Sequence, residues 1–354
     1  MDLEPAAVLP PAAASGPAAL PVPFADVLPP DVAELVARME DYARAAAGAF
    51  ADNTVRALGA DARVFAAWCQ ANARPILPAS PATVAAFIDA QAAIKAPATV
   101  ARYRSSIAAL HRAAAVPNPC SEEVVRLAVR RMNRAHGTRQ RQAEPLNRPS
   151  VERMLTTKTA ERLHRRVAEA GKAVPLIALR NAALLAVAYD TLLRRSELVA
   201  LMAEDLQRAE DGSGTVLVRR SKGDQDAQGA VKYLAPDTVG HVEVWLESSG
   251  VTQGPLFRPV SKGGLPGAGA LEDQEVRRLF RDIAVAAGVK LARAPSGHST
   301  RVGAAQDMIA AGLELGEVMQ AGSWKTVTMP ARYSERLLAR RGAARKLATL
   351  QNRA

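Results

Sequence analysis

The chain has 354 residues, 49% of them hydrophobic and 4% aromatic, and 46 Lys and Arg against 35 Asp and Glu give it a net charge of +11. This length suits two domains, the abundant alanine favours helices over sheets, and the basic balance favours a polyanionic partner, most often nucleic acid. No apolar run approaches the roughly 20 residues of a membrane span, and the N-terminus lacks the features of a signal peptide.

Two cysteines indicate a reducing compartment rather than a disulfide or metal framework. Cys69 and Cys120 belong to no CxxC or Cys/His cluster, so the sequence predicts no metal site. Cys69 follows the apolar run "VFAAW" and is expected to be a buried thiol. We therefore expect a cytoplasmic protein.

The first part of the chain is predicted to be a tail followed by a helical bundle. Residues 1–23 are dominated by proline and alanine without periodicity, which predicts a disordered tail. Residues 24–137 show helical periodicity, which predicts a compact bundle. The expected helices cover residues 31–48, 54–72, 80–93 (starting at Ser80 or Pro81), 97–115 and 121–135.

Polar faces beside the predicted cores supply candidates for DNA contact. The helix over 97–115 has a core stripe that includes Val100, Tyr103 and Ile107, with a polar face beside it. Arginines four residues apart follow on the next helix and continue into a basic linker over 138–149, so DNA backbone contact competes here with a solvated surface. The candidates are Thr54, Arg56, Thr99, Arg102, Ser106, Arg126, Arg130, Arg134, Arg139 and Arg141.

A second domain is predicted from residue 150 to 354, beginning with a helix capped by Ser150. "NAALLAVAYDTLL" is apolar all round and predicts a central buried helix. "GTVLVRRSKGDQDAQGAVKYLAP" predicts a strand pair, and "DQEVRRLFRDIAVAAG" an amphipathic helix. Lys222 is at the tip of the strand pair, and Lys232, ten residues further on, is the alternative candidate for its role.

Chemically versatile side chains accompany these elements. They are Arg194, Glu197, Lys222, His298, Arg301, Trp324 and Tyr333. The set suits attack of a phenol on a phosphodiester. Guanidiniums stabilise the transition state, an imidazole takes the phenol proton, an ammonium protonates the leaving oxygen, and an indole N–H binds a phosphate oxygen. This chemistry needs no metal.

A structural role is the alternative for each residue. Arg194 and Glu197 can form an ion pair, and Trp324 and Tyr333 can be packing aromatics. In "SGHSTRVGAA", residues 296–305, the histidine and the arginine are expected one helical turn apart. The alternative is an incidental surface pair. We interpret the small neighbours as keeping this face thin for DNA.

The order of these residues resembles that of the tyrosine site-specific recombinases, the phage integrase family. That family has an arginine, a lysine, His-x-x-Arg, a histidine or tryptophan, and then a tyrosine. "AYDTLLRRSEL", "GHSTRVGAAQDM", "EVMQAGSW" and the nine-residue step from Trp324 to Tyr333 carry the resemblance, and "FAAWCQANAR" extends it to the first domain.

The resemblance implies a mainly α fold. A helical core DNA-binding domain and a mixed, mainly helical catalytic domain with a small β-sheet would form a C-shaped clamp on double-stranded DNA. It implies that Tyr333 forms a 3′-phosphotyrosine, that Glu197 orients Arg194 and the histidine, and that no cofactor is needed.

It also implies assembly and base reading. A monomer in solution would become a homotetramer on two inverted-repeat sites, exchange strands through a Holliday junction, and act on bacterial or phage DNA at the nucleoid. The last helix, about 340–354, would dock on a neighbouring protomer. The helix that begins near residue 273 would enter the major groove, where Gln274 would read adenine and Arg277 would contact phosphate.

Three rivals remain open at this stage. One is an integrase or resolvase that needs accessory factors, although residues 1–23 do not resemble an arm-binding domain. Another is a DNA-binding relative that has lost catalysis, although all catalytic positions are filled. A type IB topoisomerase uses similar chemistry, but the first domain argues against it.

Overall fold

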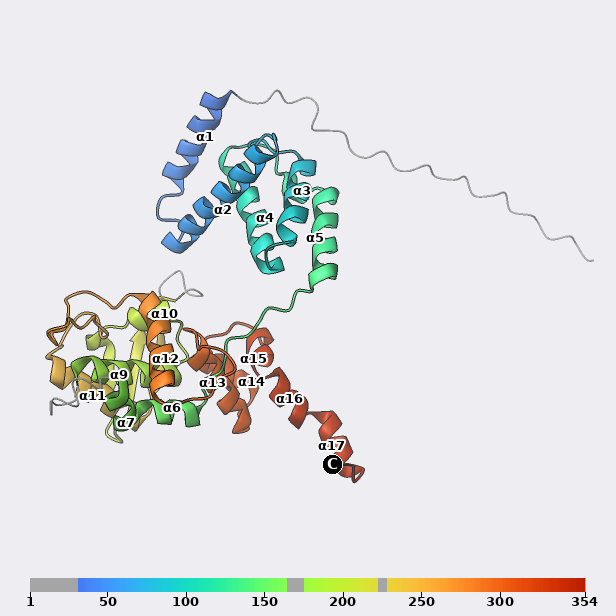
Figure 1. Ribbon diagram of the computed structural model, residues 1–354. Coiled ribbons are helices and arrows are strands. Elements are labelled where there is room, and N and C mark those ends of the chain that lie inside the picture. Colours follow the sequence, from blue (N-terminus) through green and yellow to red (C-terminus); the bar gives the residue numbers. More distant parts are fainter. Residues whose placement is uncertain (1–30, 164–174, 222–227, 354) are drawn as a thin grey trace, which may run out of the picture. The chain divides into compact units, whose positions relative to one another are not determined.

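The chain folds into two compact, mainly helical units (Figure 1). Unit 1 is residues 1–140 and unit 2 is residues 141–354. The second also contains a small antiparallel sheet, so the predicted fold class is confirmed. The computed structural model describes residues 31–163, 175–221 and 228–353. The predicted tail therefore lies outside the described residues.

Unit 1 is a helical bundle around one apolar core. Phe65 and Phe87 meet there edge to face, with ring centroids 5.0 Å apart. Ser80 caps α3 as predicted, because its Oγ accepts a hydrogen bond from the Thr83 amide at 3.1 Å. Cys69 is buried in the same core, also as predicted. The helices are α1 (Val32–Ala45), α2 (Asp52–Ala71), α3 (Pro81–Ala92), α4 (Pro97–Ala113) and α5 (Glu123–His136).

Both ends of unit 1 depart slightly from the sequence pattern. On α1, Leu35 is buried but Val32 and Val36 are 73% and 50% exposed. This helix reaches the rest of the bundle mainly through α4, so its apolar stripe is only partly covered. Ser121 does not begin α5; it ends a short 3₁₀ turn that starts at Pro119.

Unit 2 is built around α9, the apolar helix predicted to be central. Leu184, Leu185 and Val187 on α9 are completely buried. Helices α6, α11 and α13 pack around it. The helices are α6 (Arg148–Leu155), α7 (Thr157–Leu163), α9 (Leu176–Thr191), α10 (Arg195–Val199), α11 (Pro236–Ser249), α12 (Asp273–Ala286), α13 (Ser299–Ala310), α14 (Leu315–Gly322), α15 (Thr328–Tyr333), α16 (Glu335–Arg341) and α17 (Ala343–Leu350). None of the helices within the described residues is both long enough and apolar enough to cross a membrane.

The sheet of unit 2 has the strand order β1-β2-β3, with both pairs antiparallel. The predicted pair is β2 (Gly214–Val218) and β3 (Ala230–Leu234). Strand β1 (Leu206–Arg208) was not predicted, because three residues are too few to show an alternation. Lys222 lies in the connection between β2 and β3, outside the described residues.

The predicted linker over 138–149 is only partly a connection. Residues from Arg141 onward belong to unit 2, and Leu146 is completely buried in its core. The Leu146 amide donates to the carbonyl of Ser299 at 2.9 Å. Helix α6 begins at Arg148, and its N-cap residue is Asn147 rather than Ser150. The second domain therefore starts several residues before the predicted boundary at 150.

The small residues of "SGHSTRVGAA" have a different physical reason from the one predicted. A Cβ atom at Gly303 would lie 2.0 Å from the carbonyl oxygen of Leu146. Ala304 and Ala305 are buried in a small core with Leu192. This face of α13 is therefore thin because the chain's own segment packs on it, and the interpretation as a DNA-facing surface was wrong.

Candidate active site

The predicted catalytic residues come from separate segments of unit 2. Arg194 and Glu197 lie where α9 passes into α10, and Arg301 lies in the first turn of α13. Trp324 follows the end of α14, and Tyr333 is the last residue of α15. Arg301 contacts the main chain of the turn between α9 and α10 and the ring of Trp324.

The turn between α9 and α10 positions Arg194 by hydrogen bonds to Glu197. Leu192 adopts a left-handed conformation, φ 53°, which ends α9 and turns the chain. Glu197 then accepts hydrogen bonds from the Arg194 amide at 2.9 Å and from its Nη1 at 2.7 Å. The Glu197 carboxylate is buried, whereas the Arg194 side chain is 28% exposed. The carboxylate thus orients a guanidinium that solvent, or a ligand, can still reach.

Arg301 connects this turn to the end of α14. Its guanidinium donates to the carbonyl of Leu192, and its Nη2 donates to the carbonyl of Gly322 at 2.7 Å. It also lies over the Trp324 ring, 4.2 Å from the centroid. Burial, and then the charge of Arg194, lower the Arg301 pKa to about 10, so it stays protonated at neutral pH.

The candidate nucleophile, Tyr333, lies beside Trp324 and Arg301. Tyr333 and Trp324 meet edge to face, with ring centroids 5.8 Å apart, beside a small apolar cluster that includes Ile309 and Val318. Tyr333 lies close enough to Arg301 to raise the pKa of that guanidinium. The phenol is therefore next to a buried cation.

His298 stands at the start of α13. It is the N-cap residue, it is exposed, and its amide donates to the Oγ of Ser296 at 3.2 Å. Desolvation by surrounding protein, followed by the charges of Arg301 and Arg194, lowers the His298 pKa below its ordinary value. The neutral imidazole that this favours can accept a proton.

The sequence of this chain is similar to those of known proteins. Residues 153–339 match the Phage integrase family. The recombinase Cre of Escherichia phage P1 is 30% identical over 317 residues, which cover 84% of this chain and 88% of Cre. An integrase/recombinase XerD homolog of Selenomonas ruminantium is 30% identical over 295 residues, covering 80% and 82%.

The chain belongs to the phage integrase family. Solved structures of other tyrosine recombinases have the same fold. The integrase of transposon Tn1549 in complex with a circular intermediate DNA matches with a TM-score of 0.56 and 13% identity, covering 84% of this chain and 94% of that one. A lambda integrase dimer bound to a COC′ core site matches over the same shares, with a TM-score of 0.51 and 14% identity.

Of the two candidate lysines of this integrase-family chain, only Lys232 lies within the described residues. Lys222 is not among the described residues. Lys232 is buried on β3 and donates to the Ala321 carbonyl at 2.6 Å, the Ser323 Oγ at 2.7 Å and the Gln320 carbonyl at 3.4 Å. Burial, and then Arg301, lower its pKa to about 8. Lys232 thus holds the end of α14 in place. The sequence could have indicated this role, because alternation along β3 puts Lys232 on the buried face of the strand.

Most of the predicted DNA-contact residues of this family member are on the surface. Thr54, Arg56, Arg126, Arg130, Arg134, Arg139, Arg141, Gln274 and Arg277 are exposed. Arg126 and Arg130 pair with Glu123 at 2.8 and 3.6 Å. Such exposed pairs are weak, so both arginines can turn to a phosphate.

The prediction that the polar face of α4 contacts DNA is wrong for Ser106. Ser106 is buried, and its hydroxyl donates to Asp61 at 2.8 Å, so it is not placed to contact DNA. Arg102 pairs with the same carboxylate at 3.0 Å and is half exposed, and Thr99 is partly buried. The polar face of α4 therefore packs against α2, where Ser106 and Arg102 bind the buried Asp61.

A metal role finds no support in the described residues. Within 31–163, 175–221 and 228–353, no cluster of three His, Cys, Asp or Glu side chains could hold a metal ion. Cys120 is a buried thiol whose pKa burial raises to about 11, so it stays protonated.

Proposed function

We propose that this integrase-family protein is a site-specific DNA recombinase that cleaves and rejoins duplex DNA through a covalent bond to Tyr333. The observation that carries the proposal is the contact of Tyr333, Trp324 and Arg301, with Arg194 beside them on a separate turn. A phenol next to paired guanidiniums suits transesterification of a phosphodiester.

The electrostatics of the site favour an anion. The pKa values of His298, Arg301 and Lys232 are all lowered, by burial first and by neighbouring positive charge second. A phosphate would relieve the repulsion among these groups and would accept hydrogen bonds from the guanidiniums. The same cations would then stabilise the additional negative charge of a pentavalent transition state.

The proposed reaction is a balanced transesterification. The Tyr333 oxygen forms a bond to phosphorus while the bond from phosphorus to the 5′ oxygen breaks. His298 takes the phenol proton, and Lys222 gives a proton to the leaving oxygen. The phosphotyrosine keeps the free energy of the original ester, so a free 5′ hydroxyl from another strand reverses the step without ATP.

We extend the proposal to assembly and setting. The protein would act as a tetramer on two inverted-repeat sites and exchange strands in pairs through a Holliday junction. Each half-site would bind one protomer through both units, with Gln274 and Arg277 at the start of α12 reading bases and phosphate. The setting would be bacterial or phage DNA.

The proposal is tested by finding the DNA site and then observing chemistry on it. Selection of bound duplexes from a random pool should yield an inverted repeat with a short spacer. Incubation of that DNA with the purified protein should give a covalent complex on denaturing gels and exchange between two labelled sites. Specific binding that never produces a covalent complex would identify an inactive relative, and covalent complex without exchange would identify a need for accessory factors.

The proton donor can be assigned with a sulfur-substituted substrate. A 5′-bridging phosphorothioate leaves without protonation, so it should restore cleavage by a Lys222→Ala protein to nearly the unaltered rate. Lys232→Ala should also cleave slowly, because it frees the turn that carries Trp324, but sulfur should not restore its rate. Single-turnover rates on both substrates check this. Rescue of Lys232→Ala and not of Lys222→Ala would exchange the two roles.

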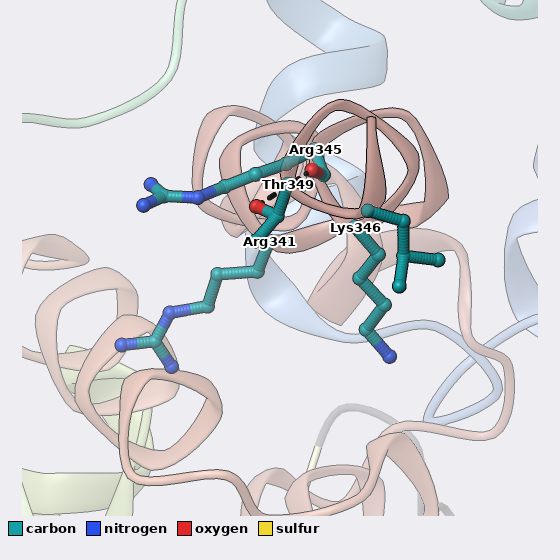
Figure 2. Close-up of a pocket in the computed structure, with 5 residues that line it drawn as sticks. Arg341, Arg345, Lys346 and Thr349 are labelled. Carbon is teal, nitrogen blue, oxygen red and sulfur yellow. Dashed lines mark hydrogen bonds between the residues drawn. The ribbon is translucent and has the colours of Figure 1, made fainter. Parts of the chain in front are cut away.

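The C-terminal helices offer an apolar strip to a partner. Neither α16 nor α17 has a buried residue, and Leu347 and Leu350 are 51% and 82% exposed. A shallow hollow beside them is lined by Arg341, Arg345, Lys346, Thr349 and Leu350, and contains none of the candidate catalytic residues (Figure 2). A helix this short needs a surface to bury its apolar strip, which we propose is a neighbouring protomer.

Deleting residues 343–354 should therefore separate binding from assembly. The shortened protein should bind one half-site with affinity within about twofold of the intact protein, because the deleted residues lie outside the proposed DNA contacts. It should lose cooperative binding to the full site and recombination. Gel-shift titrations of half and full sites measure both. A Leu347→Ser, Leu350→Ser protein should behave in the same way, and undiminished cooperativity would show that α17 does not link protomers.

A further inference from the structure

The main-chain carbonyl of Tyr333 accepts hydrogen bonds from two glutamine side chains. Gln142 Nε2 donates to this oxygen at 3.0 Å, and Gln306 Nε2 donates to it at 2.8 Å. Tyr333 ends α15, so its carbonyl has no place in the hydrogen-bond ladder of that helix. Both glutamines are partly buried. Two segments far apart in the sequence therefore hold the peptide that follows the candidate nucleophile.

Gln306 belongs to the helix that carries the cations. It lies on α13, five residues after Arg301. The neighbouring Asp307 accepts hydrogen bonds from the Asn147 side chain at 2.9 Å and from the Arg148 amide at 2.7 Å. Helix α13 thus carries Arg301, binds the backbone of Tyr333 through Gln306, and binds the segment that follows Gln142 through Asp307.

Gln142 is itself anchored on this surface. Its carbonyl accepts from Arg293 Nη2 at 3.0 Å, and Glu144 accepts from the Ala292 amide at 3.3 Å. The Leu146 amide then donates a hydrogen bond to the carbonyl of Ser299 at 2.9 Å. Gln142 also lies two residues after the end of unit 1, at Gln140. The connection between the units therefore runs directly into a contact with the backbone of Tyr333.

We infer that Gln142 and Gln306 are positioning residues that set the phenol oxygen of Tyr333 for attack, an inference that rests on the proposed function. The phenol oxygen lies at the far end of the side chain, so a small rotation of the backbone displaces it more than it displaces the carbonyl. In-line attack tolerates little displacement. The two amides also make the segment entering unit 2 part of the device that positions the nucleophile.

The first test compares substitutions at Gln142. Gln142→Glu keeps the shape of the side chain but removes the donor, whereas Gln142→Lys keeps a donor. In single-turnover cleavage of a saturating nicked site, Gln142→Glu should form covalent adduct about tenfold or more slowly, because the nucleophile is displaced. Gln306→Glu should show a similar loss, and Gln142→Lys should recover most of the rate. Gln207→Glu, at an exposed residue on β1, is the matched control and should cleave normally.

The second test separates positioning from general damage. In a Tyr333→Phe protein, hydrogen peroxide can attack the same phosphorus and release the same 5′ hydroxyl. This cleavage uses the cations but not the tyrosine, so adding Gln142→Glu should leave its rate within about twofold, since no preorganised phosphate contact has changed. Half-site affinity and the melting temperature should also stay close to those of the parent.

The outcomes decide the inference. Equal adduct rates for the unaltered and Gln142→Glu proteins would overturn it, as would an equal loss in the peroxide reaction. Absence of adduct with the unaltered protein would instead overturn the proposed function, and this inference with it.

Discussion

A Tyr333→Phe protein is expected to bind its DNA normally and to form no covalent adduct. Phenylalanine keeps the ring that packs edge to face on Trp324 and on the apolar cluster beside it. Only the hydroxyl and its interaction with Arg301 are lost. The free energy of unfolding should therefore change by about 1 kcal/mol or less, as for one hydrogen bond. Denaturing electrophoresis with labelled DNA measures the adduct.

A second tyrosine supplies the matched control. Tyr189 also loses a hydrogen bond on conversion to phenylalanine, because its hydroxyl donates to Asp307 at 2.5 Å. The Tyr189→Phe protein should still form adduct, since its phenol has no part in the proposed attack. An adduct from Tyr333→Phe, or the loss of adduct from both variants, would remove Tyr333 from the role of nucleophile.

The two arginines should differ in stability while sharing a catalytic defect. Arg194→Ala and Arg301→Ala should each slow cleavage by about 10²-fold or more, because each removes a preorganised donor to the transition state. DNA affinity should fall much less, since it depends on many other phosphate contacts. Single-turnover cleavage and half-site gel shifts measure the two quantities.

The Arg301 variant should also be the less stable of the two. Its removal leaves the buried carbonyls of Leu192 and Gly322 without these donors and takes the cation from Trp324, at a cost of about 2 kcal/mol. Thermal unfolding shows this as a lower Tm for Arg301→Ala than for Arg194→Ala. Arg208→Ala, which breaks an exposed pair with Glu243, is the control and should match the unaltered protein. Affinity that falls as much as cleavage would assign both arginines a binding role.

Local signals made much of the fold predictable. Apolar spacing located the helices of unit 1 and the buried α9, and Ser80 marked the start of α3. These features depend on hydrogen bonds and packing within a few residues, so the order of residues alone contains them.

Local signals failed where the chain meets a distant part of itself. Ser106 was predicted to contact DNA but binds Asp61, and Gly303 was read as a DNA-facing residue but lies against Leu146. A polar or small residue beside a core stripe has the same pattern in either case. What it contacts depends on which helix packs there, and periodicity does not record that.

The sequence by itself determined which side chains could do the chemistry, because the residue types and their order from Arg194 to Tyr333 follow from the primary structure. Only the tertiary structure decided how they are held. Arg301 reaches carbonyls 109 and 21 residues away, Lys232 holds the end of α14, and Gln142 reaches Tyr333 across 191 residues. Each of these bonds exists only because tertiary packing brings its partners within hydrogen-bonding distance, and no pattern along the chain encodes that proximity.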